Sequence, residues 1–455
     1  MYGVHLSIQD PAGAAVRRAN AAACLAALRD QQRPLTIAEL ATATRLARPT
    51  VDAVVGDLLQ TGPVRPAKPQ RGAGAGRPAR AYAFTADAGR VAGIDIGSGS
   101  VRVRIADLAG DIVGRAETDV PAGIDGNGRL RVVRTTVRQA VRASGAGLAD
   151  LRAAGLGVPG ILDRDGRITQ SLAVPDWIGV DPAARLSAAW DCPVLVENDI
   201  KLAALAEQRL RAEPAVGPEP ESGADRDDDL IFWQIGHRIS TALIMNGAIL
   251  QGRHRLAGEL GSLRGMRWTE SSRRGRLQWR SGRTAEQVFA RARAGDRRAA
   301  AEISEFCAEI APMIATIALT VDPALIVIGG GLSRAGDDLL APLTEAVHHM
   351  LMTDEKPAIT TSLLKSSGTL CGALGSTFEV HSAQILGVPR VPTRWHRWPG
   401  TFDGPPSKGV GPDDAVADDA ISDVLLSDVR SHAPAVPAAQ AAPAVPARST
   451  RRMSR

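Results

Sequence analysis

Between residues 90 and 390 the sequence alternates short apolar strands with helical segments, and this alternation most limits the folds that the chain can adopt. Strand-like runs stand at 91–97, 101–108 and 151–160, and glycine turns follow several of them. The run at 192–199 leads directly into a helical stretch at 200–210. Strands that alternate with helices predict α/β domains, in which helices pack on sheets.

The N-terminal part of the chain contains helical segments only, up to about residue 60. Apolar residues recur at helical spacing over 16–28 and over 49–60, and a further helix is expected to begin near Thr36. Thr36 stands three residues before Glu39, as in a capping box. A turn of three or four residues separates the second helix from the third, which predicts a helix-turn-helix.

A basic segment follows these helices. Residues 61–86 contain five cations and no acid, and a string rich in Gly and Pro lies between short β segments at 64–65 and 82–84. Two such segments, joined by that string, would form the wing of a winged helix-turn-helix. A flexible basic linker is the alternative interpretation.

Charge is concentrated in the same part of the chain. The 455 residues include 54 Lys and Arg and 49 Asp and Glu, a net charge of +5, whereas residues 1–90 hold twelve cations and six acids. The N-terminal fifth therefore carries a charge of +6, and the remainder is slightly acidic. Such asymmetry predicts a polyanion-binding module attached to a second domain. A compositional bias toward Arg also contributes to the basic total.

The candidate DNA contacts lie in the first turn of the third helix and in the wing. A recognition helix places cations and small polar groups in that turn, where it meets the major groove and neighbouring phosphates. Arg48 could make a bidentate contact with guanine, Thr50 could bond a phosphate or a base edge, and wing arginines suit the minor groove. The predicted DNA-binding residues are Arg45, Arg48, Pro49, Thr50, Arg77 and Arg80.

Three further features limit the class of protein. The cysteines at 24, 192, 307 and 371 form no CxxC pair, so we expect buried thiols rather than disulfides or a metal site. No apolar run approaches ~20 residues and no signal-peptide pattern is present, which predicts a soluble cytoplasmic protein without a membrane partner. Residues 392–455 are rich in Pro, Ala and Asp, and we expect a disordered tail.

Five short motifs occur in order along the α/β region. They are Asp95-Ile96-Gly97-Ser98-Gly99-Ser100, Gly157–Asp163, Glu197-Asn198-Asp199, Ala257–Gly261 and Ile328–Gly331. In this order and spacing, and together with the N-terminal module, they resemble the ROK family (repressors, open reading frames and sugar kinases) in its branch of transcriptional regulators. The resemblance spans about residues 16–390.

The resemblance implies a fold and a division into domains. A winged helix-turn-helix would occupy residues 1–88, followed by a two-lobed, actin-like and sugar-kinase-like fold of the ribonuclease H-like ATPase type. The lobes would cover 89–205 and 206–391, and the tail would cover 392–455. In this family two α/β lobes close on a sugar.

The resemblance also implies site residues. Family kinases need a carboxylate that takes the proton from the attacking sugar hydroxyl, and the resemblance puts it at Asp199. Asn198 would be its sugar-binding neighbour, and Glu259 would be a further ligand of a hydroxyl. An aspartate at this point could instead cap the helix that begins at Ile200, and the two roles are compatible.

Two phosphate-binding turns depart from the pattern of the family kinases. The first kinase motif, Asp-x-Gly-Gly-Thr, is Asp95-Ile96-Gly97-Ser98-Gly99 here, and the second, Gly-Thr-Gly-Ile-Gly, is Gly236-His237-Arg238-Ile239-Ser240. Bulky side chains fit poorly where the backbone must approach a phosphate closely. We therefore expect that the chain is not an enzyme, that Asp199 is a vestigial base and that no cofactor is used. Arg238 would be a structural residue or an anion ligand.

The family's zinc site and part of its sugar loop are altered as well. Ser262 replaces the His of the Glu-x-Gly-His motif, and the stretch that follows contains no Cys or His, so no zinc is expected. Ala173 stands near the place of the sugar-loop Asn, and Lys201 replaces the second Asn of the Glu-Asn-Asp-x-Asn string. The pocket would be altered, would prefer an acidic or phosphorylated sugar through Lys201, or would be idle.

Together these features predict a sequence-specific DNA-binding transcriptional regulator, and the resemblance favours a repressor over an activator. It would bind a pseudo-palindromic double-stranded operator as a homodimer. A non-catalytic sugar-kinase-like domain would sense a small sugar or sugar derivative. The alternatives are an ATP-dependent sugar kinase and a ligand-independent DNA-binding scaffold.

Overall fold

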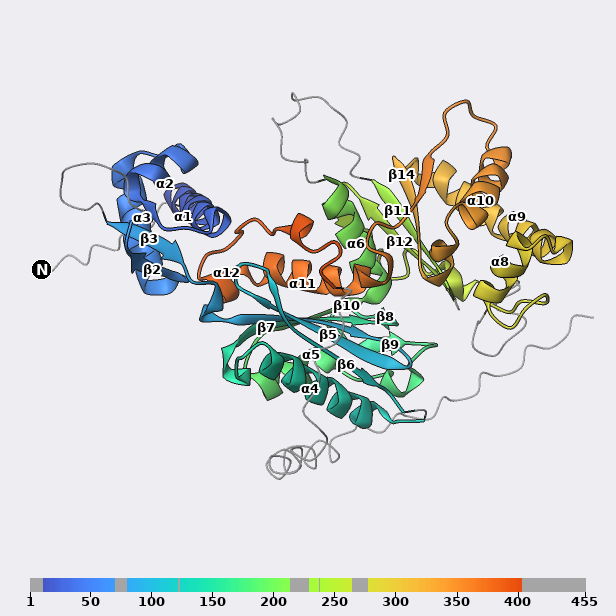
Figure 1. Cartoon of the computed structure of the whole chain (residues 1–455), viewed down its shortest axis with the longest axis horizontal. Coiled ribbons are helices and arrows are strands. Elements are labelled where there is room, and N and C mark those ends of the chain that lie inside the picture. The colour runs from blue at the N-terminus through green and yellow to red at the C-terminus, as the bar shows by residue number, and fades with distance from the viewer. Residues whose placement is uncertain are drawn as a thin grey trace, which may run out of the picture. The chain divides into compact units, whose positions relative to one another are not determined.

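A computed structural model of the chain describes residues 11–69, 80–121, 123–212, 229–236, 238–263 and 277–402. The predictions for Arg77, His237 and residues 403–455 lie outside these ranges. The described residues form an N-terminal helical unit and two five-stranded sheets, so the predicted α/β lobes are confirmed (Figure 1). The four cysteines are buried thiols, as expected, and none of them is in a disulfide.

The N-terminal unit consists of three helices and a small antiparallel sheet. Its elements are α1 (Pro11–Gln31), β1 (Leu35–Thr36), α2 (Ile37–Thr44), α3 (Arg48–Thr61), β2 (Val64–Ala67) and β3 (Ala81–Phe84). Strand β3 lies between β1 and β2 and pairs antiparallel with both. The helices share a core that includes Leu25, Leu40 and Val51, whereas Leu59 of α3 is exposed.

The local sequence explains how α2 begins and ends. The Thr36 hydroxyl accepts a hydrogen bond from the Glu39 N–H (3.3 Å), and the Glu39 carboxylate accepts one from the Thr36 N–H (2.8 Å), so the capping box is confirmed. The helix ends at Arg45, whose φ of +58° is the left-handed conformation that glycine usually occupies at this position. The chain then enters α3 after three residues.

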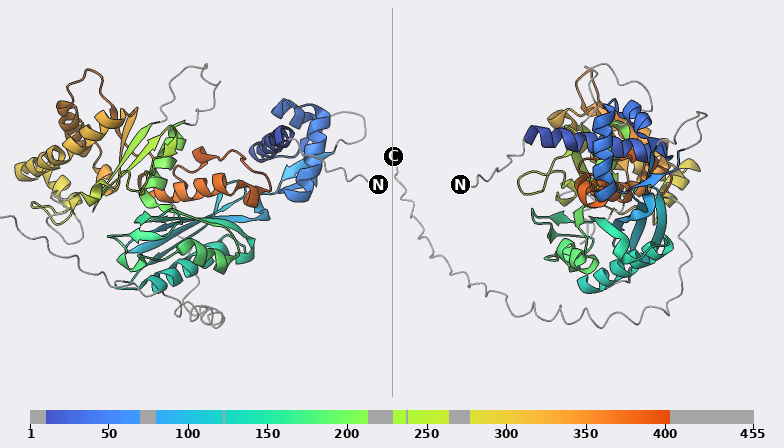
Figure 2. Two further views of the ribbon diagram at one scale, coloured as in Figure 1. Left: turned by 180° about the vertical axis from the view of Figure 1, so that it is seen from behind. Right: turned by 90° about the vertical axis from the view of Figure 1, so that its left-hand side faces the viewer.

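The first lobe is built on a mixed sheet with the strand order β10-β7-β4-β5-β6. Its strands are β4 (Arg90–Ile96), β5 (Ser100–Asp107), β6 (Ile112–Asp119), β7 (Leu151–Val158) and β10 (Val194–Asn198). Helices α4 (Gly126–Ala143) and α5 (Pro182–Trp190) cover one face (Figure 2). A short hairpin of β8 (Ile161–Leu162) and β9 (Ile168–Gln170) extends from β7.

The second lobe has a similar sheet with the order β13-β12-β11-β14-β15. Its strands are β11 (Leu230–Ile235), β12 (Ile239–Met245), β13 (Ala248–Ile249), β14 (Leu325–Gly329) and β15 (Ala358–Thr361). One face packs against α8 (Ala285–Arg293), α9 (Arg297–Val321) and α10 (Asp337–Met350). By length and composition α9 could cross a membrane, but its residues Phe306, Ile310 and Ile314 are buried in the core of this lobe.

Two helices, α6 (Asp199–Ala212) and α11 (Gly368–Val380), pack against each other and connect the lobes. Helix α6 packs on β11 and β12 of the second sheet, and α11 packs on β4 and β7 of the first. The expected boundary between 205 and 206 therefore falls inside α6. Helix α11 lies within the expected second lobe, 206–391, but covers the first sheet. The chain thus returns to the first lobe, where Leu370 and Leu374 of α11 are buried in the core.

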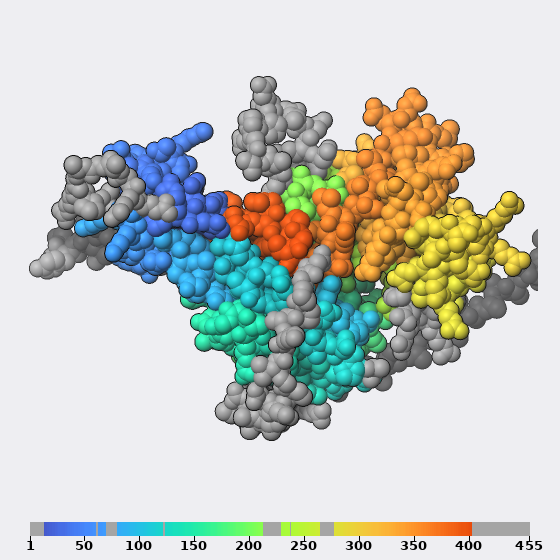
Figure 3. All heavy atoms as spheres, in the orientation of Figure 1, coloured from blue at the N-terminus to red at the C-terminus, as the bar shows by residue number. Residues whose placement is uncertain are grey.

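The segment that follows α11 and α12 (Ser382–Leu386) differs from the expected disordered tail. Residues 392–402 are part of the packed structure, and Trp395, Trp398 and Phe402 are almost completely buried. The Trp398 indole donates to the Gly110 carbonyl at 2.7 Å, and the Phe402 carbonyl accepts from the Arg104 guanidinium at 2.7 Å. Figure 3 shows this segment in orange-red against the cyan first lobe.

The close contact between α6 and α11 predicts that Gly372 tolerates no side chain. A Cβ atom at Gly372 would lie 2.1 Å from the Leu202 carbonyl oxygen, so the Gly372→Ala variant should lose about 1–3 kcal/mol of unfolding free energy or more. At Gly56, inside α3, a Cβ would meet nothing within 4 Å. The Gly56→Ala control should therefore gain ~0.5–1 kcal/mol. Thermal and urea unfolding measure both, and equal effects would contradict the close packing.

Candidate functional site

The candidate site is organised where β10 ends and α6 begins. Asn198 is the last residue of β10, and its Oδ1 accepts hydrogen bonds from the N–H groups of Ile200 and Lys201, both at 3.0 Å. Its Nδ2 donates to the Gly160 carbonyl at 3.0 Å. Asn198 is therefore the residue that caps α6, and it also ties the helix to the turn after β7.

Because Asn198 caps the helix, the Asp199 carboxyl lies at the first turn of α6, where it accepts a hydrogen bond from the Ile200 N–H at 3.0 Å. Burial raises the pKa of Asp199 to about 8, and the neighbouring Asp95 and Glu259 carboxylates add to this rise. Asp95 itself is paired with Arg102 on the adjacent strand, at 3.0 Å from the Arg102 Nε. The site therefore holds one carboxyl that can change its protonation near neutral pH.

A pocket opens in front of Asp199, and both lobes contribute to it. The first lobe supplies the turn after β7 and the end of the β8–β9 hairpin, and the second lobe supplies the β11–β12 turn and the loop after β13. The polar side chains that line it are Gln170, Ser171, Asn198, Asp199, Arg238, Ser240, Glu259 and Ser262. The structure thus brings together all three residues that the resemblance assigns to a sugar, namely Asn198, Asp199 and Glu259.

Glycines set the position of Glu259. Gly258 has a φ of +85°, and a Cβ at this residue would lie 2.5 Å from the Thr241 carbonyl oxygen. A Cβ at Gly261 would lie 2.1 Å from the Ile239 carbonyl oxygen. The loop therefore lies directly on β12, which turns Glu259 into the pocket. Burial raises the pKa of Glu259, while the nearby Lys201 ammonium opposes that rise.

Arg238 lies at the wall of this pocket. It belongs to the turn between β11 and β12, and its Nη2 donates to the Leu172 carbonyl of the first lobe at 3.3 Å. The contact supports the structural role that the sequence suggested, because it joins the two walls of the pocket. Its guanidinium also places a positive charge within reach of a bound ligand.

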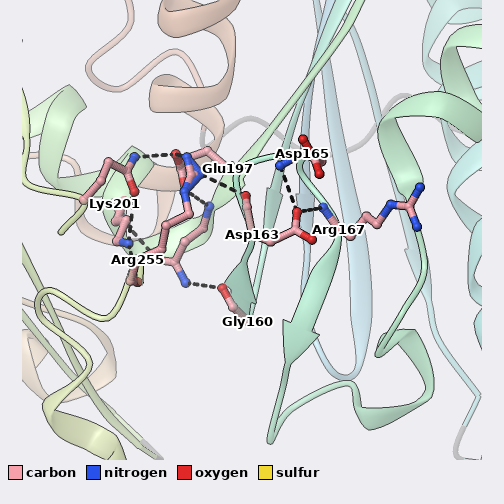
Figure 4. A network of polar contacts seen from close by, with 9 residues as sticks. Gly160, Asp163, Asp165, Arg167, Glu197, Lys201 and Arg255 are labelled. Carbon is pink, nitrogen blue, oxygen red and sulfur yellow. Dashed lines mark hydrogen bonds and ion pairs between the residues drawn. The ribbon is translucent and has the colours of Figure 1, made fainter. Parts of the chain in front are cut away.

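A polar network next to the pocket connects the same two lobes (Figure 4). The Glu197 carboxylate accepts a hydrogen bond from the Gln251 amide at 2.8 Å and lies 3.6 Å from the Arg255 guanidinium. Arg255 also donates to the Asp163 carbonyl at 3.3 Å. The sequence could have indicated Glu197, which precedes Asn198 in the same motif, but Gln251 and Arg255 carry no local signal.

Lys201 belongs to this network and not to the pocket wall. Its ammonium is buried and donates to the Gln251 side chain at 3.4 Å and to the Arg255 carbonyl at 3.3 Å. Burial lowers the pKa of Lys201, while Glu197 and Glu259 oppose that shift. The interpretation that Lys201 selects an acidic sugar receives no support from this arrangement, because its charge faces the loop after β13.

Five of the predicted DNA-binding residues lie in the described part of the N-terminal unit. Arg45, Arg48 and Pro49 are exposed at the turn between α2 and α3, and Thr50 is half-buried in the first turn of α3. Arg80 is exposed just before β3. The N-terminal turn of α3 is thus an open, basic surface.

Two glycine turns are open beside the backbone, namely the altered phosphate-binding turn between β4 and β5 and the turn after β14. A Cβ at Gly99, in the β4–β5 turn, or at Gly331, after β14, would meet nothing within 4 Å, so both turns leave room beside the backbone. Gly330 has a φ of +86°, which suits the tight turn at the end of β14. A zinc cage is not supported by the described part of its loop, since Ser262 offers no zinc ligand of the usual type.

Comparison with known proteins agrees with this geometry. A family model described as "ROK family" matches residues 91–267 and 265–382. The glucokinase of Halalkalibacterium halodurans is 26% identical over 290 residues, which cover 56% of this chain and 83% of that protein. The xylose repressor of Caldicellulosiruptor bescii is 21% identical over 175 residues, which cover 38% of this chain and 41% of the repressor.

A solved structure extends the fold comparison beyond the two lobes. It is described as a ROK family transcriptional regulator, a homolog of the E. coli MLC protein, and it superposes with a TM-score of 0.59 at 19% identity. The superposition covers 82% of this chain and 98% of that one. It is therefore longer than the span of the family model and reaches residues outside 91–382.

The prediction that the chain is not an enzyme is wrong. The glucokinase match extends over both lobes, and the pocket retains the Asp199 carboxyl in the position that the resemblance gives to the catalytic base. The altered side chains of two turns remove neither this carboxyl nor the open glycine turns at Gly99 and Gly331. The lobes resemble those of a sugar kinase in their residues as well as in their fold.

The raised pKa of Asp199 predicts a pH-dependent stability. An unfolded Asp ionises near pH 4, whereas folded Asp199 keeps its proton up to about pH 8, so its contribution to stability should fall as the pH rises from about 4 to 8. The Asp199→Asn variant lacks this group, so its melting temperature should rise relative to that of the wild type as the pH increases from 5 to 9. Asp52→Asn, at an exposed carboxyl in α3, is the control. Parallel curves for wild type and Asp199→Asn would contradict the assignment.

Proposed function

We propose that this chain, which belongs to the ROK family, is a DNA-binding transcriptional regulator whose two lobes bind a sugar. The observation that carries the proposal is the combination of two separate surfaces in one chain. One is the open basic turn at the start of α3, and the other is the pocket around Asp199. A sugar kinase needs only the second.

The N-terminal unit supports the DNA-binding half of the proposal. Its order of three helices followed by the β2–β3 pair is that of a winged helix-turn-helix, in which the last helix enters the major groove through its N-terminal residues. Arg45 and Arg48 are exposed at that end of α3. The regulator structure superposes on more of the chain than the family model spans.

The pocket supports the sugar-binding half. Carboxylates and amides that converge from two lobes are suited to the hydroxyl groups of a sugar, which both donate and accept hydrogen bonds. Asp199 and Glu259 supply acceptors from opposite lobes, so a bound sugar would hold the lobes together. Movement of the lobes would then alter the spacing of two DNA-binding units in a soluble, cytoplasmic homodimer. Release of DNA from a repressor is the expected result.

A second candidate function is phosphorylation of a sugar by ATP, which the relatives named as kinases favour. A general base works best when its pKa lies near the operating pH, and the pKa of Asp199 is raised to about 8. Asp199 would take the proton of the sugar hydroxyl that attacks the terminal phosphate. ATP would supply the phosphoryl group, and the open turns at Gly99 and Gly331 would lie beside it.

The DNA-binding proposal predicts a base-specific loss in the Arg48→Ala variant. Bound sequences would first be selected from a random duplex library with the wild-type protein. The variant should then bind the selected duplex more weakly by ~1–3 kcal/mol and lose its preference at one base position. Arg298→Ala, at an exposed arginine of the second lobe, is the control and should bind like the wild type. An unchanged sequence preference for Arg48→Ala would contradict the role of α3.

The pocket proposal predicts that a sugar stabilises the wild type and not the Asp199→Asn variant. In a thermal-shift panel of hexoses, pentoses and N-acetylhexosamines, a ligand at ~100 times its Kd should add ~2.7 kcal/mol of stability. Asp52→Asn should keep this response. The same sugars, mixed with ATP, test the kinase function. If the chain is a kinase, the wild type should release ADP when a sugar is present, and the Asp199→Asn variant should not. A panel without any thermal shift would contradict sugar binding.

A further inference from the structure

The N-terminal unit shares one hydrophobic core with the last residues that the structure describes. Leu25 of α1 and Trp395 belong to the same cluster of buried side chains. The Arg29 guanidinium, near the end of α1, is buried and donates to the Pro392 carbonyl at 2.8 Å. Residues 392–402, which we call the docking segment, therefore hold the N-terminal unit against the first lobe.

Trp395 attaches the docking segment to α11. A Cβ atom at Gly375 of α11 would lie 2.0 Å from the Trp395 ring, so the ring lies directly on the helix. The indole N–H of Trp395 donates to the Glu379 Oε1 atom at 3.1 Å. Helix α11 lies beside α6 (Figure 1). The position of the docking segment thus depends on α11 and on the Glu379 carboxylate.

The same oxygen atom of Glu379 also binds a side chain of α6. The Arg209 Nε atom donates to Glu379 Oε1 at 3.3 Å, and the Arg209 Nη1 atom donates to the Gly247 carbonyl at 3.0 Å. Gly247 lies in the turn between β12 and β13 of the second lobe. Because α6 packs on the second sheet and α11 packs on the first, one carboxylate oxygen connects the second lobe with the docking segment.

Helix α6 leads from this contact to the pocket. It begins at Asp199, and Arg209 is ten residues further along, a distance of ~15 Å on the helix axis. A ligand that binds both Asp199 and Glu259 would draw the lobes together, and α6 would then shift against α11. A hydrogen bond weakens steeply when its angle changes. Such a shift would therefore alter the contact between Arg209 and Glu379.

We propose that Glu379 is a positioning residue that couples the pocket to the DNA-binding surface, an inference that rests on the proposed function. When α6 moves, the Arg209 contact with the Glu379 oxygen changes, and the Trp395 contact with the same atom changes with it. The docking segment then shifts, and Arg29 passes the shift to α1, which packs against α3. Such coupling is reciprocal, so DNA should weaken sugar binding by the same factor by which the sugar weakens DNA binding.

The test measures the ratio of the duplex Kd with a saturating sugar to the duplex Kd without it. The sugars are D-glucose, D-xylose and N-acetyl-D-glucosamine, and the duplex is the one selected with the wild-type protein. With one of them the wild type should show a ratio of ~5 or more, whereas Glu379→Ala should show a ratio below ~2. Its Kd for the duplex alone should not change. Glu305→Ala, which removes a carboxylate that pairs with Arg280 inside the second lobe, is the matched control and should keep the wild-type ratio.

Two further variants separate coupling from folding. Arg209→Ala removes the contact from the side of α6 and should also lower the ratio, while Glu379→Gln keeps an acceptor and should preserve more of the ratio than Glu379→Ala. Circular dichroism melting would establish that each variant is folded. A folded Glu379→Ala variant with the wild-type ratio would overturn the inference. A weaker affinity for the duplex at an unchanged ratio would do the same, because it indicates a structural role alone.

Hydrogen–deuterium exchange separates this inference from the proposed function, because it needs no DNA. The same sugar should change the exchange of peptides from α1 and from the docking segment in the wild type, and not in Glu379→Ala. If this result is obtained with a protein that does not bind duplexes, the proposed function fails and the coupling stands. If exchange in α1 responds equally in both proteins, or in neither, the inference fails. A sugar-dependent duplex affinity of the wild type would still support the proposed function.

Discussion

The rest of the structure depends on the close approach of α11 to α6. Gly372 lets α11 lie directly on the Leu202 carbonyl, and Gly155 lets it lie on the first sheet beside Ala373. Each helix also packs on the sheet of one lobe. Small residues, mainly Gly and Ala, therefore make the contacts that join the two lobes, which agrees with an aromatic content of only 3%. Larger side chains here would push the sheets apart and remove the pocket.

This helix pair also determines what the pocket can do. Asn198 caps α6 and bonds to Gly160, so the start of the helix is fixed against the first lobe. Asp199 consequently faces the second lobe, where Glu259 is held in place by Gly258 and Gly261. A ligand between these carboxyls would be enclosed by both lobes, which suits a sensor as well as a kinase. The difference between the two functions lies in ATP binding and in the N-terminal unit.

Local patterns in the sequence predicted much of the fold and part of the site. The Thr36 capping box, the strand runs and the Asn198-Asp199 motif depend on neighbours in the chain, so periodicity and spacing reveal them. Long-range contacts leave no such trace. The ion pair of Arg255 with Glu197 and the burial of Trp398 both join residues that are far apart in the sequence. The composition of residues 392–455, rich in Pro, Ala and Asp, therefore predicted a disordered tail, although Trp395, Trp398 and Phe402 are buried in the core.

The distribution of charge along the sequence has the same limitation, because it does not show which charged residues meet in the fold. The excess of +6 in residues 1–90 pointed to the N-terminal unit, while the arginines of the lobes seemed to reflect composition because nearby acids balanced them in number. A balance of numbers does not show which charges neutralise one another. Arg102, Arg129 and Arg209 are paired in the structure, whereas Arg45 and Arg48 are exposed at the turn between α2 and α3. The cations that stay open to a partner are therefore determined by contacts in the folded chain, and a count of charges along the sequence does not identify them.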